Sequence, residues 1–505
     1  MSARSRHDEE AGERTWLLKQ DNDSNASRGQ NSHQDAGDDE NEVEEVGFAE
    51  NDEQDPKNWP LSRKYLNVFV IFSIALCLPM ISSILAPALD DIATAFGTSK
   101  MTIIGAQTGF VCMLGIGPLF LAPMSETFGR RKVFLINLVI FTILEIPIAL
   151  CRDVYSFLIL RTLSGLFGSV GVANGGGSIS DMFKTNERAT VLGFYLLGPL
   201  LGPTIGPFAG GMITSSHNWR WLFWFSLILA AVVTVITYFC LHETNAKTIL
   251  AERKQKLEKE HQGQQYKVQG ESDQSVFAKI AGNSTRACKI LFYQPAVLIM
   301  SAYQALVFST MYSLYTNYSS IFSSPPYNFS DEQVAVAYLA PAVGFILTAF
   351  IVVPFIDKIY NKLAQEKNNG EGKPEYRLPL ANIGAFFLPI SLFWFGWSIQ
   401  TEQHWAIVLA STLFFGASQV SIFNTVQNYY IDSFESMAAS ALAAGAFLRS
   451  MVGGIVPLFV PQMFDKLGYG WGMSVFGIIS VLLMPAPLLF FFYGAKLREK
   501  YKLDL

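Results

Sequence analysis

Apolar and polar segments alternate along most of the chain. After Lys64, apolar runs of roughly 20 residues are separated by short polar gaps. A helix of that length matches the hydrocarbon core of a bilayer, which is about 30 Å thick. Twelve runs are predicted to span the bilayer: 65–88, 102–123, 133–151, 155–180, 188–213, 221–241, 291–322, 333–357, 378–399, 404–430, 437–461 and 471–494. The pattern therefore predicts an all-α membrane protein with twelve transmembrane helices.

The composition agrees with this prediction. Of 505 residues, 50% are hydrophobic and only 16% are charged, whereas a soluble chain of this length would carry more charge. The five cysteines form no CxxC pair, so neither a disulfide framework nor a zinc site is indicated. No phosphate-binding loop or nucleophile–base pair stands out. We therefore expect a protein that is not an enzyme, has no cofactor and does not bind nucleic acid.

Four segments are expected along the chain. Residues 1–60 are acidic and poor in large apolar residues, and they contain no signal peptide, so we predict a disordered tail. A first half with six helices then covers 61–245, and a second covers 291–505. The charged stretch 246–290 between them is expected to be a solvated linker with a helical part.

Basic residues predict the orientation of the helices. Lys and Arg gather in one set of connections, at residues 63–64, 130–132, 184–188, 242–290, 358–377 and 496–502. The alternate set contains only Lys100, Arg152, Arg220 and Lys466. Connections rich in Lys and Arg face the cytosol, so both termini are expected on the cytosolic side of the membrane. We expect this membrane to be the plasma membrane.

A weak internal repeat relates the two predicted halves. A shift of 251 positions brings Asp181 onto Asp432, Gly165 onto Gly416 and Gly202 onto Gly453. Two parallel halves with six spans each are one common transporter architecture. The repeat therefore predicts two pseudo-symmetric halves.

The stretch "GPLLGPTIGPFAGG", residues 198–211, repeats glycine and proline every four residues in the fifth predicted span. Its spacing of Gly193, Gly202, Gly206-Pro207 and Gly210-Gly211 resembles the antiporter signature of the major facilitator superfamily, and in particular of fungal drug:proton antiporters with twelve spans. Small residues allow close packing of helices in lipid, and proline bends them. The resemblance implies the major facilitator fold and a helix that seals the cavity between rocking halves and favours export. Generic small-residue packing is the alternative.

A second motif, "APMSETFGRRKV", resembles the loop signature that follows helix two in this superfamily, with Glu126, Gly129, Arg130 and Arg131 in its places. Ala122 and Glu126 stand where the signature usually has Gly and Asp. We expect these residues to form a cytosolic gate that latches the outward-facing state. Asp181, at the cytosolic end of helix four, is a further candidate for this gate because of its position. The carboxylate could also meet a helix N-terminus, and the arginines alone could simply fix the topology.

Three charged residues are candidates for proton coupling. Arg161 lies inside the fourth span, where an unpaired charge is costly, and the family motif has an arginine there. Glu145 in helix three and Asp432 at the end of helix ten are candidate carriers, because burial can raise a carboxyl pKa toward neutrality. A structural ion pair is the alternative for Arg161, local pairing for Glu145 and a gate role for Asp432.

Polar and aromatic residues of the central helices are candidates for the substrate cavity. These are Gln107, Asn174, Tyr303, Gln304, Tyr312, Tyr315, Asn424 and Gln427. Aromatic side chains with few fixed charges suit flat, amphiphilic compounds, although tyrosines in membrane proteins often serve as interface anchors.

Together these features favour a monomeric exporter of hydrophobic or aromatic small molecules, such as drugs or secondary metabolites. It would be driven by the proton gradient and act by alternating access. Uptake of a nutrient or polyamine and a non-transporting sensor are the competing hypotheses.

Overall fold

The computed structural model describes residues 44–49, 51–261, 266–268, 276–434 and 437–501. In these ranges, twelve helical segments are long and apolar enough to cross a bilayer. The prediction of an all-α protein with twelve membrane-spanning helices is therefore confirmed.

Six spans form the first half, and three of them are broken into two helices. In chain order the elements are α2 (Leu61–Ser83) with η2 (Ala86–Ala88) and α3 (Leu89–Phe96), α4 (Lys100–Phe128), α5 (Arg130–Leu150), α6 (Val154–Gly168) with α7 (Val170–Met182), α8 (Thr185–Tyr195) with α9 (Leu197–Thr214), and α10 (Trp221–Cys240).

Six further spans form the second half. They are α13 (Pro295–Phe322), α14 (Asp331–Ala337) with α15 (Ala340–Asn368), α16 (Pro379–Gln400), preceded by η3 (Pro374–Arg377), α17 (Trp405–Ser433), α18 (Ala438–Ile455) with η5 (Val456–Leu458), and α19 (Val460–Leu483) with α20 (Ala486–Lys500). Gly468 interrupts α19 with a φ of 72°, so the last helical segment is kinked at this residue.

Equivalent helices pack on one another in the two halves. Helix α6 packs on α4 as α17 packs on α15, and α9 packs on α2 as α18 packs on α13. A Cβ on Gly165 would clash with the backbone of Phe110 in α4, and one on Gly416 would clash with the carbonyl of Pro341 in α15. Both glycines thus allow the same close helix approach, which confirms the pseudo-symmetry.

The segment before the first span is ordered in part. Strand β1 (Glu44–Val46) pairs in parallel with β2 (Tyr266–Val268) beside the linker helix α11 (Ala246–Glu260). Val46, Leu250 and Tyr266 form a small apolar cluster there. Burial of these side chains offsets the cost of ordering, so the prediction of a disordered tail as far as residue 60 was wrong for residues 44–49 and 51–60. Residues 1–43 lie outside the described residues.

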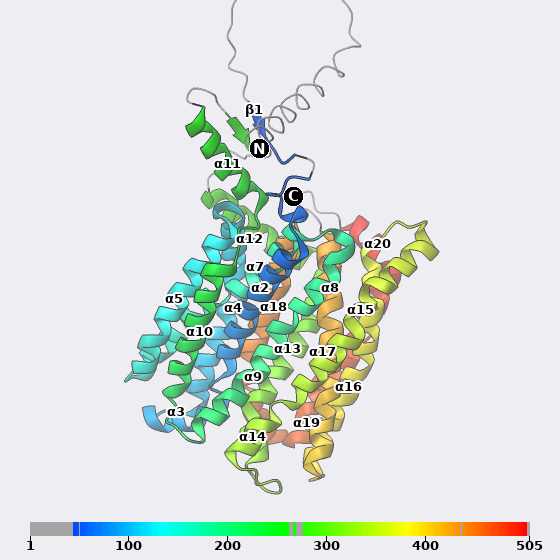
Figure 1. Ribbon diagram of the computed structural model, residues 1–505. Helices are drawn as coiled ribbons and strands as arrows, with labels where there is room; N and C mark the ends of the chain where they lie inside the picture. The colour runs from blue at the N-terminus through cyan, green and yellow to red at the C-terminus, as the bar shows by residue number, and fades with distance from the viewer. Residues whose placement is uncertain (1–43, 50, 262–265, 269–275, 435–436, 502–505) are drawn as a thin grey trace, which may run out of the picture.

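Both ends of the described chain lie at one end of the helix bundle, together with α11 and the second linker helix α12 (Val276–Tyr293) (Figure 1). We call this the terminal end. Helices α3 and α14 lie at the opposite end, which we call the distal end (Figure 1).

Candidate functional site

Two neighbouring cavities lie between the halves. The larger, the terminal cavity, has a volume of about 230 Å³ and is lined by residues of α4, α7, α12 and α18. The smaller, the inner cavity, has a volume of about 40 Å³ and includes Tyr195, Phe423, Gln427 and Arg449 in its wall. Both cavities share the lining residues Pro118, Ala173, Gly176, Leu442 and Ala443. Together they form a pathway that enters the interface from the terminal end.

Hydrogen bonds join the halves nearer the distal end. Ser82 of α2 shares a hydrogen bond of 2.9 Å with the hydroxyl of Tyr312 in α13. The hydroxyls of Thr204 and Tyr315 also pair across the interface. Thr108 donates to the carbonyl of Gly454 at 2.8 Å. The interface is therefore closed by polar contacts on the side away from the terminal cavity.

The eight residues predicted for the substrate cavity separate into four groups. Gln427 lines the inner cavity. Tyr312 and Tyr315 instead hold the halves together. Tyr303 lines neither cavity, and its hydroxyl lies 3.4 Å from the carbonyl of Ala385 in α16. The sequence could not show which face of α13 each tyrosine occupies.

The other four predicted cavity residues are buried amides: Gln107, Asn174, Gln304 and Asn424. Each has at least one amide atom without a hydrogen-bond partner among the described residues. Buried polar atoms of this kind are normally satisfied, so they are available to a ligand or water. None of the four lines the terminal or inner cavity directly.

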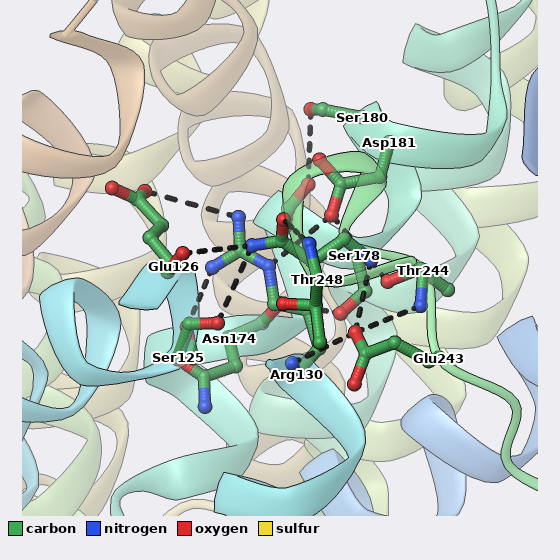
Figure 2. A network of polar contacts seen from close by, with 12 residues as sticks. Ser125, Glu126, Arg130, Asn174, Ser178, Ser180, Asp181, Glu243, Thr244 and Thr248 are labelled. Atoms are coloured by element: carbon green, nitrogen blue, oxygen red, sulfur yellow. Dashed lines mark hydrogen bonds and ion pairs between the residues drawn. The ribbon is translucent and has the colours of Figure 1, made fainter. Parts of the chain in front are cut away.

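Arg130 is the centre of a charged cluster at the terminal end (Figure 2). Its guanidinium donates to Asp181 at 3.2 Å and to the hydroxyl of Ser125 at 2.6 Å. Glu126 lies 3.8 Å from the same guanidinium. The structure thus brings together Glu126, Arg130 and Asp181, which the sequence predicts to form a gate, and all three line the terminal cavity.

Glu243, which the sequence analysis did not single out, caps helix α5. Its carboxylate accepts from the backbone N–H groups of Arg130 at 2.9 Å and Arg131 at 3.0 Å. Gly129 precedes this helix with a φ of 99°, and a Cβ there would clash with Glu243. Glu243 therefore supplies the anion at the N-terminus of α5, where the helix dipole favours it.

The second half contains a counterpart of this cluster. Arg377 binds Asp432 at 2.7 Å and Asp357 at 2.6 Å, as Arg130 binds Asp181 in the first half. Burial acts to lower the pKa of Arg377. The carboxylates of Asp432 and Asp357 have the larger opposite effect, so the pKa of Arg377 is raised above its ordinary value. Arg188 of α8 also binds Asp432 at 3.2 Å. Asp432 thus lies in a polar bridge between the halves.

Arg161 and Glu145 form a fully buried pair. The guanidinium lies 3.9 Å from the Glu145 carboxylate, and both side chains are 0% exposed. Arg161 also donates to the carbonyl of Ile81 at 3.0 Å and lies over the ring of Phe110. Neither carboxylate oxygen of Glu145 has a hydrogen bond among the described residues. The pair links α5 and α6 with α2 and α4.

The glycine motif has two sets of neighbours. A Cβ on Gly202 would come within 2.6 Å of the carbonyl oxygen of Leu76 in α2, and Gly206 and Gly210 also face α2. Gly193 and Gly211 instead face Val353 and Ala335 of the second half. The groove therefore packs mainly within the first half, while the ends of the motif reach the interface that the sequence suggested.

Proline inside α9 is accommodated by a neighbouring helix. Pro207 has no N–H, so the carbonyl of Pro203 one turn earlier loses its helical partner. The hydroxyl of Ser83 in α2 donates to this carbonyl at 2.9 Å. A side chain of the packed neighbour thus satisfies the freed carbonyl, as expected for proline in a bundle.

Sequence reasoning missed Arg377 and Arg449 as well as Glu243. The repeat offset of 251 carries Arg130 to position 381, four residues from Arg377, so a tolerant search would have found it. Arg449 lies within an apolar span, a pattern that by itself indicates function.

Comparisons with known proteins agree with this architecture. Residues 71–457 match the Major Facilitator Superfamily. The chain is 36% identical to "MFS transporter cpaT" of Aspergillus oryzae, over 90% of this chain and 92% of the relative. It is 34% identical to "Efflux pump radE" of Floropilus chiversii, over 89% of this chain and 83% of that relative. The fold is similar to that of the proton:xylose symporter XylE, with a TM-score of 0.64 at 16% identity, over 86% of this chain and 96% of that one.

Proposed function

Since this chain belongs to the major facilitator superfamily of membrane transporters, we propose that it exports hydrophobic or aromatic small molecules in exchange for protons. Two similar fungal proteins carry names that describe efflux pumps. The fifth-span glycine motif supports the same direction of transport. Secondary metabolites and foreign drugs both fit this substrate class.

The terminal end faces the cytosol in this proposal, as its basic connections favour. Substrate then enters the terminal cavity from the cytosol and moves toward the inner cavity. For release, the hydrogen bonds around Tyr312 and Tyr315 break while the terminal end closes. Each chain contains both halves, so a monomer in the plasma membrane is sufficient for alternating access.

Closure of the terminal end has a natural site. Helix α18 begins at the terminal cavity, and its N-cap residue Met437 provides no side-chain hydrogen bond. Glu126 lines the same cavity. In the outward-facing state its carboxylate meets the N-terminus of α18, where backbone N–H groups and the helix dipole favour an anion. Arg130 contacts Ser125 and Glu126 and binds Asp181, and so holds the last turn of α4, which carries Glu126.

The observation that carries the proposal of proton coupling is the buried pair of Glu145 and Arg161. A carboxylate without hydrogen bonds among the described residues, held by one guanidinium at 3.9 Å, loses only this ionic contact when it is protonated. Protonation of Glu145 releases Arg161, whose hydrogen bond to Ile81 connects it to α2. In this proposal, protonation therefore changes the packing of the first half.

A vesicle assay tests this function. The purified protein is placed in sealed vesicles, a pH gradient is imposed, and the movement of fluorescent hydrophobic compounds is followed. We expect movement against the proton flow that an uncoupler abolishes. Movement with the proton flow would favour uptake, and no movement of any compound would favour a sensor; either result would contradict the proposal.

A further inference from the structure

Arg449 in α18 is a buried cation in the wall of the inner cavity. Its side chain lies on the same cavity surface as Gln427 and Phe423, and only 3% of the residue is exposed. A charged group at this depth in a membrane protein is costly unless it is paired or faces water or a ligand. Its position therefore needs an explanation.

No carboxylate pairs with Arg449 among the described residues. The other arginines with little exposure each have one: Asp181 lies 3.2 Å from Arg130, Glu145 lies 3.9 Å from Arg161, and Asp432 lies 2.7 Å from Arg377. Within the part of the chain that the structure describes, the Nε and Nη1 atoms of Arg449 have no hydrogen-bond partner.

The titratable groups that interact with Arg449 electrostatically are the phenols of Tyr195, Tyr312 and Tyr430. Phenols carry no charge near neutral pH, so they do not balance the guanidinium. Three observations therefore point the same way. The guanidinium of Arg449 is buried, it lines a cavity, and its Nε and Nη1 atoms have no hydrogen-bond partner among the described residues.

Two phenylalanines flank the guanidinium. The guanidinium carbon Cζ of Arg449 lies 4.9 Å from the ring centroid of Phe308 and 4.8 Å from the ring centroid of Phe423. The two rings are nearly parallel, with an interplanar angle of 16°. Rings held in this way stabilise the cation and present flat apolar surface beside it. The arrangement fits a ligand that has both an anionic group and a flat ring system.

We propose that Arg449 is the counter-ion for an anionic group on the transported compound, so that the substrate class is aromatic organic anions. A carboxylate or an ionised enol can accept two parallel hydrogen bonds from a guanidinium, which makes arginine selective for such groups. Cationic compounds are disfavoured by the uncompensated charge. This inference rests on the proposed function, because it specifies the substrate of the same pathway.

Binding of three matched probes tests the inference without a gradient. The probes are naphthalene-2-carboxylate, its neutral amide and naphthalen-2-ylmethylammonium, titrated by calorimetry into the full-length protein in lipid nanodiscs. We expect the carboxylate to bind at least ten times more tightly than the amide, and the ammonium to bind most weakly. Arg449→Gln should reduce the preference for the carboxylate to less than twofold, while Arg449→Lys should keep part of it.

A second variant protects the test against misfolding. Gln427→Glu introduces a carboxylate into the same cavity, where it can neutralise Arg449 without removing it. We expect at least a tenfold loss of affinity for the carboxylate probe and no decrease in Tm. The control is Arg220→Gln at the distal end, where the arginine donates to the carbonyl of Cys151. This variant should keep the wild-type preference.

Several outcomes would overturn the inference. They are no binding of any probe by the wild-type protein, equal binding of carboxylate and amide, or a preference that persists in both Arg449→Gln and Gln427→Glu. The vesicle assay is independent of this result. Anion-selective binding without gradient-driven movement would support the role of Arg449 and reject proton-driven export. Gradient-driven movement without a preference for anions would support proton-driven export and reject the role of Arg449.

Discussion

At the scale of single residues, the interior of this protein is defined by how its buried charges are balanced. Arg130 and Arg377 each bind carboxylates closely, at distances of 2.6–3.2 Å. Arg161 and Glu145 are further apart, at 3.9 Å, and both are fully buried. Close pairs suit fixed scaffolds, whereas a loose buried pair suits a group that changes charge during a cycle.

The Glu145–Arg161 pair can be tested with single and double variants. Glu145→Gln leaves a buried arginine without a counter-ion, so we expect a loss of stability of about 3–5 kcal/mol and loss of gradient-driven transport. The double variant Glu145→Gln/Arg161→Gln removes both charges and should recover most of the Tm without recovering transport. Thermal unfolding and the vesicle assay measure the two effects. Recovery of both in the double variant would mean that the pair is only structural.

Ser83 gives a residue-scale test of how α9 tolerates proline. Ser83→Ala removes the donor to the carbonyl of Pro203, leaving a buried acceptor without a partner. We expect a loss of about 1–3 kcal/mol in stability, seen as a lower Tm. Ser73→Ala is the matched control, because the hydroxyl of Ser73 donates to the carbonyl of Phe69 in its own helix and, among the described residues, contacts no other helix through a hydrogen bond. Equal effects of the two variants would contradict this account.

The sequence predicted individual site residues unevenly. Arg161, Arg130 and Asp181 could be found, because a charge inside or at the end of an apolar run is conspicuous. The neighbours of Tyr303, Tyr312 and Tyr315 could not be distinguished, because all faces of α13 carry similar residues and periodicity cannot select one. Glu243 could not be recognised as a cap, since its partners lie 112 and 113 positions away in the sequence.

At the scale of elements, the glycine motif of α9 explains why this helix packs so closely on α2. Backbone atoms of Leu76, Met80 and Ile84 lie where Cβ atoms would be placed. The twelve spans themselves were predictable, because the bilayer imposes the length of each apolar run. The breaks at Ser169, Leu196 and Gly468 were not, because they depend on packing between helices.

Gly206→Ala tests the groove. A Cβ there would clash with the carbonyl oxygen of Met80, which belongs to the backbone and cannot move freely. We expect at least a tenfold loss of transport while the protein still reaches the membrane. Gly282→Ala is the matched control, since no atom lies within 4 Å of its added Cβ. Unchanged transport in Gly206→Ala would reject the role of the groove.

At the scale of the whole molecule, contacts between the halves occur at both ends. Arg188 and Asp432 bridge them at the terminal end, and Ser82 with Tyr312 and Thr204 with Tyr315 bridge them on the distal side. The repeat in the sequence predicted two similar halves. It could not predict these bridges, because they depend on how the halves dock.

Removal of the distal bridges should shift the molecule toward its outward-open state. Tyr312→Phe/Tyr315→Phe deletes both hydroxyls but keeps the rings. Spin labels at the exposed positions Asn218 and Thr401, in a background without the five native cysteines, report the distance between the halves at this end. We expect a second population several Å further apart. An unchanged distance distribution would mean that these bonds do not hold the distal side closed.

Under the proposed function, substrate and protons move in opposite directions through this protein. The most direct measurement follows both at once in vesicles of known orientation, with a pH-sensitive dye inside and a fluorescent aromatic compound as substrate. We predict that proton entry accompanies each exit of the compound from the terminal side, and that Glu145→Gln uncouples or abolishes both fluxes. Fluxes in the same direction, or compound movement without any proton flux, would contradict the claim.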